Sequence, residues 1–351
     1  MFLNFINYFR GFAILLIVIG HLFGTVKVFN YDDPYLNSIF TKSFFSLVSG
    51  GTSLFVFISG FLFHHVFYSR GFNFKKFLIN KLKNVLCPYL VLMTPVVIFQ
   101  LLNVPRYQKL YSSTGEFLKY LFLSLYSGTM LLSTWYIPFA FLLFLSSPIF
   151  IKFIEMKKFH KTIMFVLLIA GSIVHRPAHD FTVNVFQALI YFSPVYCLGI
   201  YISMKKDDFF EKFGDKSYVF GLITLGILAF QIYTGKFINS HKSILIYKGL
   251  DIVIYQKFFM CLFLVLFFNK FEKHFNKIFK SIFDILAEYS FPIFFLHNYI
   301  IQFIYPAIGF EKESGYIGLI LLTILTLFLS IAFAYIIKKT FKKNSRYLIG
   351  G

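Results

Sequence analysis

The chain has 351 residues, of which 58% are hydrophobic and 22% aromatic, whereas only 14% are charged. So few charged side chains could not cover so much apolar surface in water, so this composition excludes a soluble globular protein and indicates one surrounded by membrane lipid. The formal net charge of +19 does not indicate nucleic-acid binding, because the Lys and Arg residues lie in short loops between apolar segments. We therefore expect no nucleic acid among its partners.

Ten apolar segments are long enough to span a hydrocarbon layer of about 30 Å. The sequence therefore predicts an all-α, polytopic integral membrane protein with a single transmembrane domain over residues 1–351. A further short apolar stretch, Glu116 to Leu125, is typical of an interfacial or re-entrant helix. The predicted segments are 7–28, 44–67, 83–103, 131–153, 161–176, 185–204, 217–235, 250–269, 282–306 and 316–338.

The loops between these segments differ in charge from one side of the membrane to the other. With the N-terminus in the cytoplasm, the inner loops and the C-terminal tail hold more than twice as many Lys and Arg residues as the outer loops. Because such a bias marks the cytoplasmic side, we expect both termini in the cytoplasm.

The first segment carries two polar residues in an otherwise apolar run, Arg10 near one end and His21 in the middle. Ten residues lie between them, about three helical turns, so both side chains fall on nearly one face, roughly 16 Å apart along the axis. A cation and a titratable imidazole at membrane depth are costly unless they line a protein cavity. This face is the leading candidate for an active site.

The outer loop HRPAHD carries two histidines with the spacing of metal ligands, His175 and His179. Pro177 stands between them and argues against one helical face, so we expect no metal there but an outward-facing polar cluster that could touch a glycan. The three cysteines form no ligand pattern and lie inside apolar segments, at Cys87, Cys197 and Cys261.

Motifs in the first three segments have a recognisable order. The first segment opens with YFRGFAILLIVIGH, which contains Arg10 and His21, and GGTSLFVFISGFLF at residues 50–63 contains an SGF triplet. FKKFLINKLKNVLCPYLV then leads into the third segment with Lys81 and Lys83. These motifs resemble the first three helices of the acyltransferase-3 family of integral membrane O-acyltransferases, whose signature is an Arg or Lys, ten residues and a His.

The later segments resemble the same family. STWYIPFAFLLFLSSPIF is similar to its fourth helix, with Trp135 at the family's Trp-Phe-Leu position. AEYSFPIFFLHNYII is similar to its penultimate helical stretch, with Glu288, Ser290 and His297 in place. We expect a carboxylate at Glu288 to need a cation, either Arg10 or a lysine, and His297 to be structural.

Two positions depart from the family pattern. Asn7 stands where an acidic residue often precedes the Arg by three positions, and Lys81 and Lys83 replace the usual Arg-x-Arg. Lysine keeps the charge but lacks the bidentate fork that binds phosphate. The predicted topology places Arg10, Lys81 and Lys83 at the cytoplasmic face, where they could hold the phosphates of a coenzyme A donor.

The resemblance implies an O-acyltransferase of a bacterial inner (cytoplasmic) membrane. It would move an acyl group, which we expect to be acetyl, from cytoplasmic acetyl-CoA to a hydroxyl of a cell-surface or lipid-linked glycan. His21 would be the general base, since an imidazole titrates near neutrality, or would relay the acyl group through a covalent intermediate. Arg10 and Glu288 complete the predicted catalytic set, and Trp135 and Ser290 are the predicted substrate-binding residues.

Two other classes of protein fit the same sequence. A ten-helix transporter or flippase for a glycan intermediate would use Arg10, His21 and Glu288 as a proton or substrate relay, although the inverted repeats typical of transporters are not evident. A non-catalytic membrane partner of a polysaccharide synthase is the third possibility. No Gly-x-Ser-x-Gly elbow, P-loop or dinucleotide motif supports a serine hydrolase, an NTPase or a dehydrogenase. Nor do we expect the C-terminal SGNH-type esterase domain that some relatives of the family carry.

Overall fold

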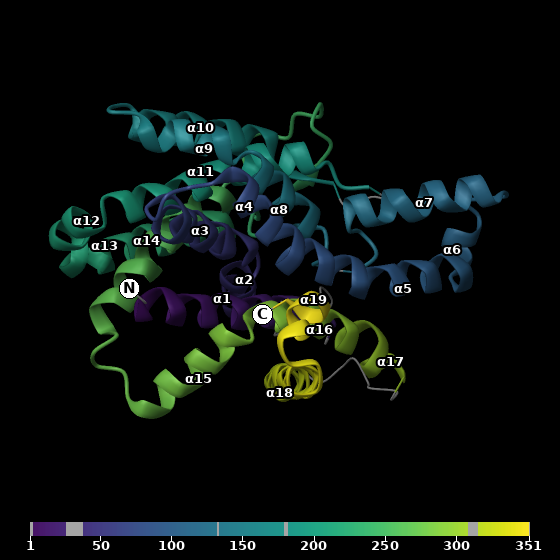
Figure 1. Ribbon diagram of the computed structural model, residues 1–351. Helices are drawn as coiled ribbons and strands as arrows, with labels where there is room; N and C mark the ends of the chain where they lie inside the picture. The colour runs from purple at the N-terminus through teal and green to yellow at the C-terminus, as the bar shows by residue number, and fades with distance from the viewer. Residues whose placement is uncertain (1–2, 26–37, 132, 179–181, 308–314, 351) are drawn as a thin grey trace.

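The computed structural model describes residues 3–25, 38–131, 133–178, 182–307 and 315–350. Nearly every element in these ranges is helical, and their strands are one short parallel pair, β1 (Arg176–Pro177) and β2 (His241–Lys242). Figure 1 shows helices from distant parts of the sequence packed side by side, with the hairpin of α5 and α7 projecting from the rest. The prediction of an all-α, polytopic membrane protein is confirmed.

The bounds of the helices follow the predicted segments closely in position, although several segments are divided. The first half of the chain forms α1 (Asn4–Thr25), α2 (Ile39–Val48), α3 (Thr52–Leu62), η1 (Phe63–Tyr68), α4 (Phe74–Lys81), η2 (Leu82–Leu86), α5 (Cys87–Asn103), α6 (Pro105–Gln108), α7 (Thr114–Ser127), α8 (Tyr136–Leu145), α9 (Ser147–Glu155) and α10 (His160–Val174). The second half forms α11 (Val185–Met204), α12 (Lys206–Phe213), η3 (Gly214–Lys216), α13 (Ser217–Tyr233), α14 (Val253–Phe271), α15 (Lys277–Glu288), α16 (Ser290–Tyr299), η4 (Ile300–Ile304), α17 (Tyr305–Ala307), α18 (Gly315–Phe341), η5 (Lys342–Asn344) and α19 (Ser345–Ile349).

The structure does not confirm the ten membrane spans that the sequence predicts. Within the described ranges, seven helices are long and apolar enough to cross a membrane, or eight if the bent pair α8 and α9 forms one span. The fifth predicted segment forms α10, which has only 15 residues. The ninth is divided between α15 and α16, because Pro292 has no N–H to donate to the carbonyl of Glu288. The count of ten is therefore not confirmed.

Two other predicted spans are bent or broken. The second is interrupted between α2 and α3, where Gly50 has a φ of +76°, a left-handed conformation that glycine adopts without strain. The fourth bends by 53° between α8 and α9. Pro148 in the first turn of α9 cannot donate to the carbonyl of Phe144, so the helix is not continuous there.

Helix α1 lies at the centre of the fold and packs against α2, α3, α14, α15, α16 and α18. Figure 1 shows it between α3 and α15. The stretch α15–α16 runs parallel to α1, because Asn7 contacts Asp284 and, 14 and 13 residues further along the two stretches, His21 contacts His297. An alternating topology requires this of the first and ninth segments, which cross in the same direction.

Helices α3 and α11 approach each other so closely that only glycine fits at the crossing. A Cβ on Gly60 would lie 2.1 Å from the carbonyl oxygen of Tyr196, and a Cβ on Gly199 would lie 2.1 Å from that of Phe57. Small residues let the backbones of membrane helices pack in this way. The glycine of the SGF triplet is therefore a packing position that holds α3 against α11.

Candidate active site

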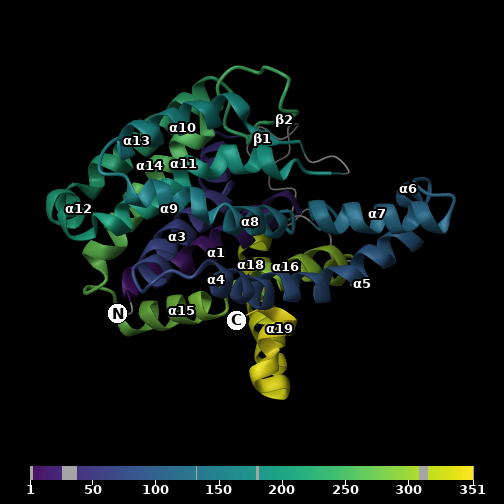
Figure 2. The same ribbon diagram turned by 45° about the horizontal axis from the view of Figure 1, so that its top comes forward.

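A cavity of about 960 Å³ lies beside the second half of α1. Its wall includes His21, the junction of α2 and α3, the segment before α8, the two strands and the end of the α16–α17 stretch. Figure 2 shows β1 and β2 far from both labelled chain ends. The cavity therefore reaches His21 from the side opposite to the N-terminus of α1. The predicted topology places this opposite side outside the cytoplasm.

His21 forms a pair with His297 on this wall. Nδ1 of His21 lies 2.9 Å from Nε2 of His297, and the two rings are stacked with their centroids 5.1 Å apart. His297 is fully buried, and its Nδ1 lies 2.7 Å from the carbonyl oxygen of Ile293 one turn earlier. The structure thus joins the predicted base to a histidine that we expected to be only structural.

The carbonyl of Ile293 decides where the protons of this pair lie. A carbonyl oxygen only accepts hydrogen bonds, so Nδ1 of His297 carries a hydrogen and donates it to Ile293. Nε2 of a neutral His297 is then an acceptor, and Nδ1 of His21 donates to it. His21 is consequently held in the tautomer whose lone pair is on Nε2, the nitrogen that can take up a proton.

Trp135, a predicted substrate-binding residue, also lines the cavity. Its ring is buried and stacks against Phe192 of α11. Next to it, the hydroxyl of Ser133 accepts a hydrogen bond from the side-chain amide of Asn298, the buried neighbour of His297. The segment before α8 is thereby tied to the helix that carries the histidine pair.

Arg176 is a cavity residue that the sequence analysis did not single out. His175 and Arg176 are only 1% and 5% exposed, so the expectation of an outward-facing cluster is wrong for this part of HRPAHD. His175 is held inside because Nε2 donates to the carbonyl of Gly249 and Nδ1 accepts from the hydroxyl of Ser240. The signal that could have found Arg176 was an arginine directly at the end of an apolar segment.

Strand β2 brings a second imidazole to the same wall. His241 is the register partner of Arg176, and its Nδ1 donates to the carbonyl of Pro177 at 2.8 Å. Burial, with a smaller contribution from the charge of Arg176, lowers the pKa of His241 to about 4. This imidazole is therefore neutral at physiological pH, and it adds no charge to the cavity.

Arg10 lies at the other end of α1 and does not belong to the cavity wall. Its Nη2 donates to Oδ1 of Asn7 at 3.2 Å, and Nδ2 of Asn7 donates to Oδ1 of Asp284 at 2.6 Å. Asn7 occupies the position where an acidic residue was expected from the resemblance. The carboxylate is supplied instead by α15, one hydrogen bond further from the arginine.

The two predicted donor-binding lysines lie in different environments. The ammonium group of Lys81 is enclosed by three aromatic rings, with its nitrogen 4.7 Å from the centroid of Phe67 and 4.6 Å from that of Phe144. Lys83 is exposed. The cation of Lys81 is therefore held by aromatic faces, while that of Lys83 remains accessible from outside the fold.

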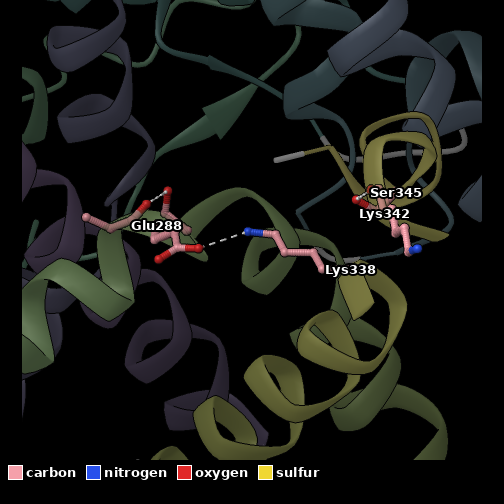
Figure 3. Close-up of polar contacts among 6 residues, drawn as sticks. Glu288, Lys338, Lys342 and Ser345 are labelled. Atoms are coloured by element: carbon pink, nitrogen blue, oxygen red, sulfur yellow. Dashed lines mark hydrogen bonds and ion pairs between the residues drawn. The ribbon is translucent and has the colours of Figure 1, made fainter. Parts of the chain in front are cut away.

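Glu288 and Ser290 lie at the junction of α15 and α16 and do not line the cavity. Figure 3 shows the side chain of Lys338 reaching the carboxylate of Glu288, at 3.3 Å. The cation that we expected for Glu288 is thus a lysine of α18 and not Arg10. The hydroxyl of Ser290 donates to the carbonyl of Ala287 at 2.8 Å, which satisfies an acceptor at the helix break.

The described residues contain no group of three or more His, Cys, Asp or Glu side chains that could hold a metal ion. Of the metal motif considered in the sequence, His179 lies outside the described residues. Cys197 and Cys261 are buried, Cys87 is half-buried, and all three are free thiols.

Comparison with known protein families assigns the chain to a family. A family model described as an acyltransferase domain matches residues 3–339 and so covers nearly the whole chain. No curated protein and no solved structure matches.

Proposed function

The chain belongs to the acyltransferase family that this domain defines and is a multi-pass membrane acyltransferase, and from this premise we propose that it is an O-acetyltransferase. The donor would be acetyl-CoA from the cytoplasm, and the acceptor a hydroxyl of a cell-surface or lipid-linked glycan. The protein would lie in a bacterial inner membrane. The observation that carries the proposal is a base-competent histidine, His21, on the wall of a cavity large enough for a sugar.

The chemistry assigned to His21 follows from its tautomer. The acceptor hydroxyl gives its proton to Nε2 of His21 as its oxygen attacks the thioester carbonyl. The carbon–sulfur bond then breaks, the acyl group remains on the acceptor oxygen, and the coenzyme A sulfur leaves and takes up a proton. The carbonyl-anchored ring of His297 accepts from Nδ1 of His21 and stabilises the imidazolium that forms. In the alternative route His21 carries the acyl group covalently between donor and acceptor.

The donor is proposed to approach from the end of the fold that holds Arg10. In this proposal Arg10 and Lys83 bind the phosphates, and Lys81 adds its positive charge from between its aromatic rings. The extended acyl-carrying arm reaches along α1 to His21. The axial separation of Arg10 and His21 is roughly 16 Å, a distance that an extended donor can cover. The cavity supports this arrangement, because it lies on the side of His21 that faces away from Arg10 and can therefore hold the acceptor.

The other predicted residues receive separate roles. Trp135 is proposed to stack against the acceptor, since it lines the cavity and aromatic faces are suitable surfaces for sugar rings. Glu288 and Ser290, which lie outside the cavity, would act on the donor side or through the junction of α15 and α16. Glu288→Gln and Lys338→Met both remove the ion pair between these two side chains. If Glu288 takes part in transfer, Glu288→Gln lowers activity more than Lys338→Met does. If the ion pair only holds the junction together, the two variants lower activity equally.

The proposal is tested by measuring transfer of radiolabelled acetyl from acetyl-CoA to endogenous glycans in inverted membrane vesicles that contain the protein. We expect His21→Ala to lower transfer by about 10²- to 10⁴-fold, the usual contribution of general base catalysis. Detergent-solubilised His21→Ala must still elute as a folded protein. Transfer at the wild-type rate by this variant would overturn the assignment of His21.

A second experiment distinguishes an acyltransferase from a transporter. A transporter or flippase would move a labelled glycan across the membrane without attaching acetyl, and His21→Ala would slow that movement. If the purified wild-type protein in liposomes moves glycan and never modifies it, the proposed reaction is wrong.

A further inference from the structure

Arg176 is a buried cation whose hydrogen-bond donors are not all used. The residue is 5% exposed and lines the cavity, and within the described part of the chain its Nε and Nη2 atoms have no hydrogen-bond acceptor. The guanidinium group lies over the rings of Tyr191 and Phe192, at 5.6 and 5.3 Å from their centroids. Because buried charged donors without acceptors are costly, this arrangement favours a ligand that supplies oxygen atoms.

A second buried cation lies near Arg176. Lys257 is 1% exposed, and its ammonium group donates to the carbonyls of Ser46 and Leu47 at the end of α2. The nearest buried carboxylate described, Asp251, already accepts from the hydroxyl of Tyr191 and the backbone of α14. Both oxygens of Asp251, the carboxylate that interacts electrostatically with Arg176, are therefore used by other donors, and Nε and Nη2 of Arg176 are left for a ligand to bind.

Both cations meet at the break between α2 and α3. A Cβ on Gly50 would lie 3.3 Å from Nη2 of Arg176 and 3.0 Å from Cε of Lys257. Gly51 and Thr52, at the N-terminus of α3, line the same cavity, and the N-terminal N–H groups of a helix carry a partial positive charge. The side-chain oxygen of Asn239, also on this wall, is buried and has no hydrogen-bond partner in the described part of the chain.

We propose that Arg176, Asn239 and the N-terminus of α3 form a subsite for an oxyanion, the carboxylate or phosphate group of the acceptor. The subsite rests on the proposed function, because it holds the charged group of the acceptor while the hydroxyl to be acylated lies at His21. Arg176 binds two oxygen atoms through Nε and Nη2, and the oxygen of Asn239 accepts from a neighbouring hydroxyl. The enzyme therefore selects acidic or phosphate-bearing glycans over neutral ones.

The test measures binding in the absence of any acyl donor, by calorimetry on the full-length protein in nanodiscs. The probes are glucuronate, glucose 1-phosphate and neutral glucose. We expect one of the charged sugars to bind at least tenfold more tightly than glucose, as charge-assisted hydrogen bonds require. Tighter binding of glucuronate identifies a carboxylate as the source of the oxyanion, and tighter binding of glucose 1-phosphate identifies a phosphate.

Arg176→Gln should reduce the affinity for the charged sugar to that for glucose, and Arg176→Lys should retain only part of the preference, because lysine lacks the fork. The matched control is Arg346→Gln, an exposed arginine of α19 outside the cavity. If Arg176→Gln does not fold, binding of the charged sugar to the wild-type protein is measured in the presence of inorganic phosphate. Phosphate should compete with the charged sugar for the subsite and weaken its binding. Equal wild-type affinities for all three sugars, or an unchanged preference in Arg176→Gln, would overturn the subsite.

The two proposals fail in different ways. Binding in His21→Ala should keep its preference for the charged sugar, since that variant changes only the base. Intact charge preference without acetyl transfer by the wild type would remove the proposed reaction and leave the subsite. Acetyl transfer without charge preference would remove the subsite alone.

Discussion

Nδ1 of His21 lies 2.9 Å from Nε2 of His297, although the two residues are 276 positions apart in the sequence. The contact exists because α16 runs parallel to α1 and because the carbonyl of Ile293 holds the ring of His297 from behind. A single backbone acceptor thus sets the proton positions of two histidines and leaves Nε2 of His21 as the basic nitrogen.

Removal of His297 should impair catalysis without impairing binding. We expect His297→Ala to lower kcat for acetyl transfer about 10- to 100-fold with KM for acetyl-CoA unchanged, the usual effect of losing the group that orients a reactive histidine. His297→Gln should recover part of kcat, because its amide oxygen can accept from Nδ1 of His21. A kcat of the wild-type size in His297→Ala would show that the pair has no catalytic role.

The chain Arg10–Asn7–Asp284 should affect the donor. Asn7→Ala removes the acceptor of Nη2 of Arg10, and we expect KM for acetyl-CoA to rise about fivefold, which corresponds to one hydrogen bond of about 1 kcal/mol. Asn7→Asp should raise KM as well, because its carboxylate would lose the N–H that Asn7 donates and would face the carboxylate of Asp284. Asn4→Ala, an exposed residue at the start of the same helix, is the control and should leave KM unchanged.

The crossing of α3 and α11 should tolerate no larger residue. In Gly60→Ala the new methyl group would meet the carbonyl of Tyr196 at 2.1 Å, so the helices must separate, and we expect a cost of about 1–3 kcal/mol or more. Gly226→Ala in α13 has no atom within 4 Å of its new Cβ and should raise stability slightly through its helix propensity. Thermal unfolding in detergent, followed by size-exclusion chromatography, measures both. A Tm of Gly60→Ala equal to that of the wild type would contradict the close crossing.

Acid should destabilise the protein through His241. The pKa of His241 is about 4 in the folded state, below the ordinary histidine value of 6.5, so between these values the unfolded chain binds more protons than the folded one. The contribution of this residue to stability is therefore complete above about pH 7 and is lost as the pH falls from 6.5 towards 4. His241→Asn, which keeps a donor for the carbonyl of Pro177, should show a smaller fall in Tm between pH 7 and pH 5.

His274→Asn, which replaces an exposed imidazole, is the control for this experiment and should keep the acid sensitivity of the wild type. If the fall in Tm is as large in His241→Asn as in the wild type, burial of His241 is not the source of the acid sensitivity.

The class of the protein, and the helix that carries Arg10 and His21, can be predicted from the sequence alone. Segments of apolar residues predict membrane helices because each must satisfy its own backbone in lipid, and this prediction does not depend on how the helices pack. The separation of Arg10 and His21 also follows from helical rise within one segment. The breaks were harder to predict, since the break at Gly50 and the divided ninth segment lie inside runs that remain apolar throughout.

Which side chains meet depends on how helices from distant parts of the chain pack. His297 was expected to be structural, and its contact with His21 depends on the packing of α16 against α1. Asp284 replaces the missing acid of α1 from another helix, and Arg176 enters the cavity because β1 pairs with β2. An arginine at the end of an apolar segment can face water, lipid headgroups or a cavity, and its own sequence neighbours are the same in all three cases. The choice is made by residues far away in the chain, whose contacts no local pattern encodes.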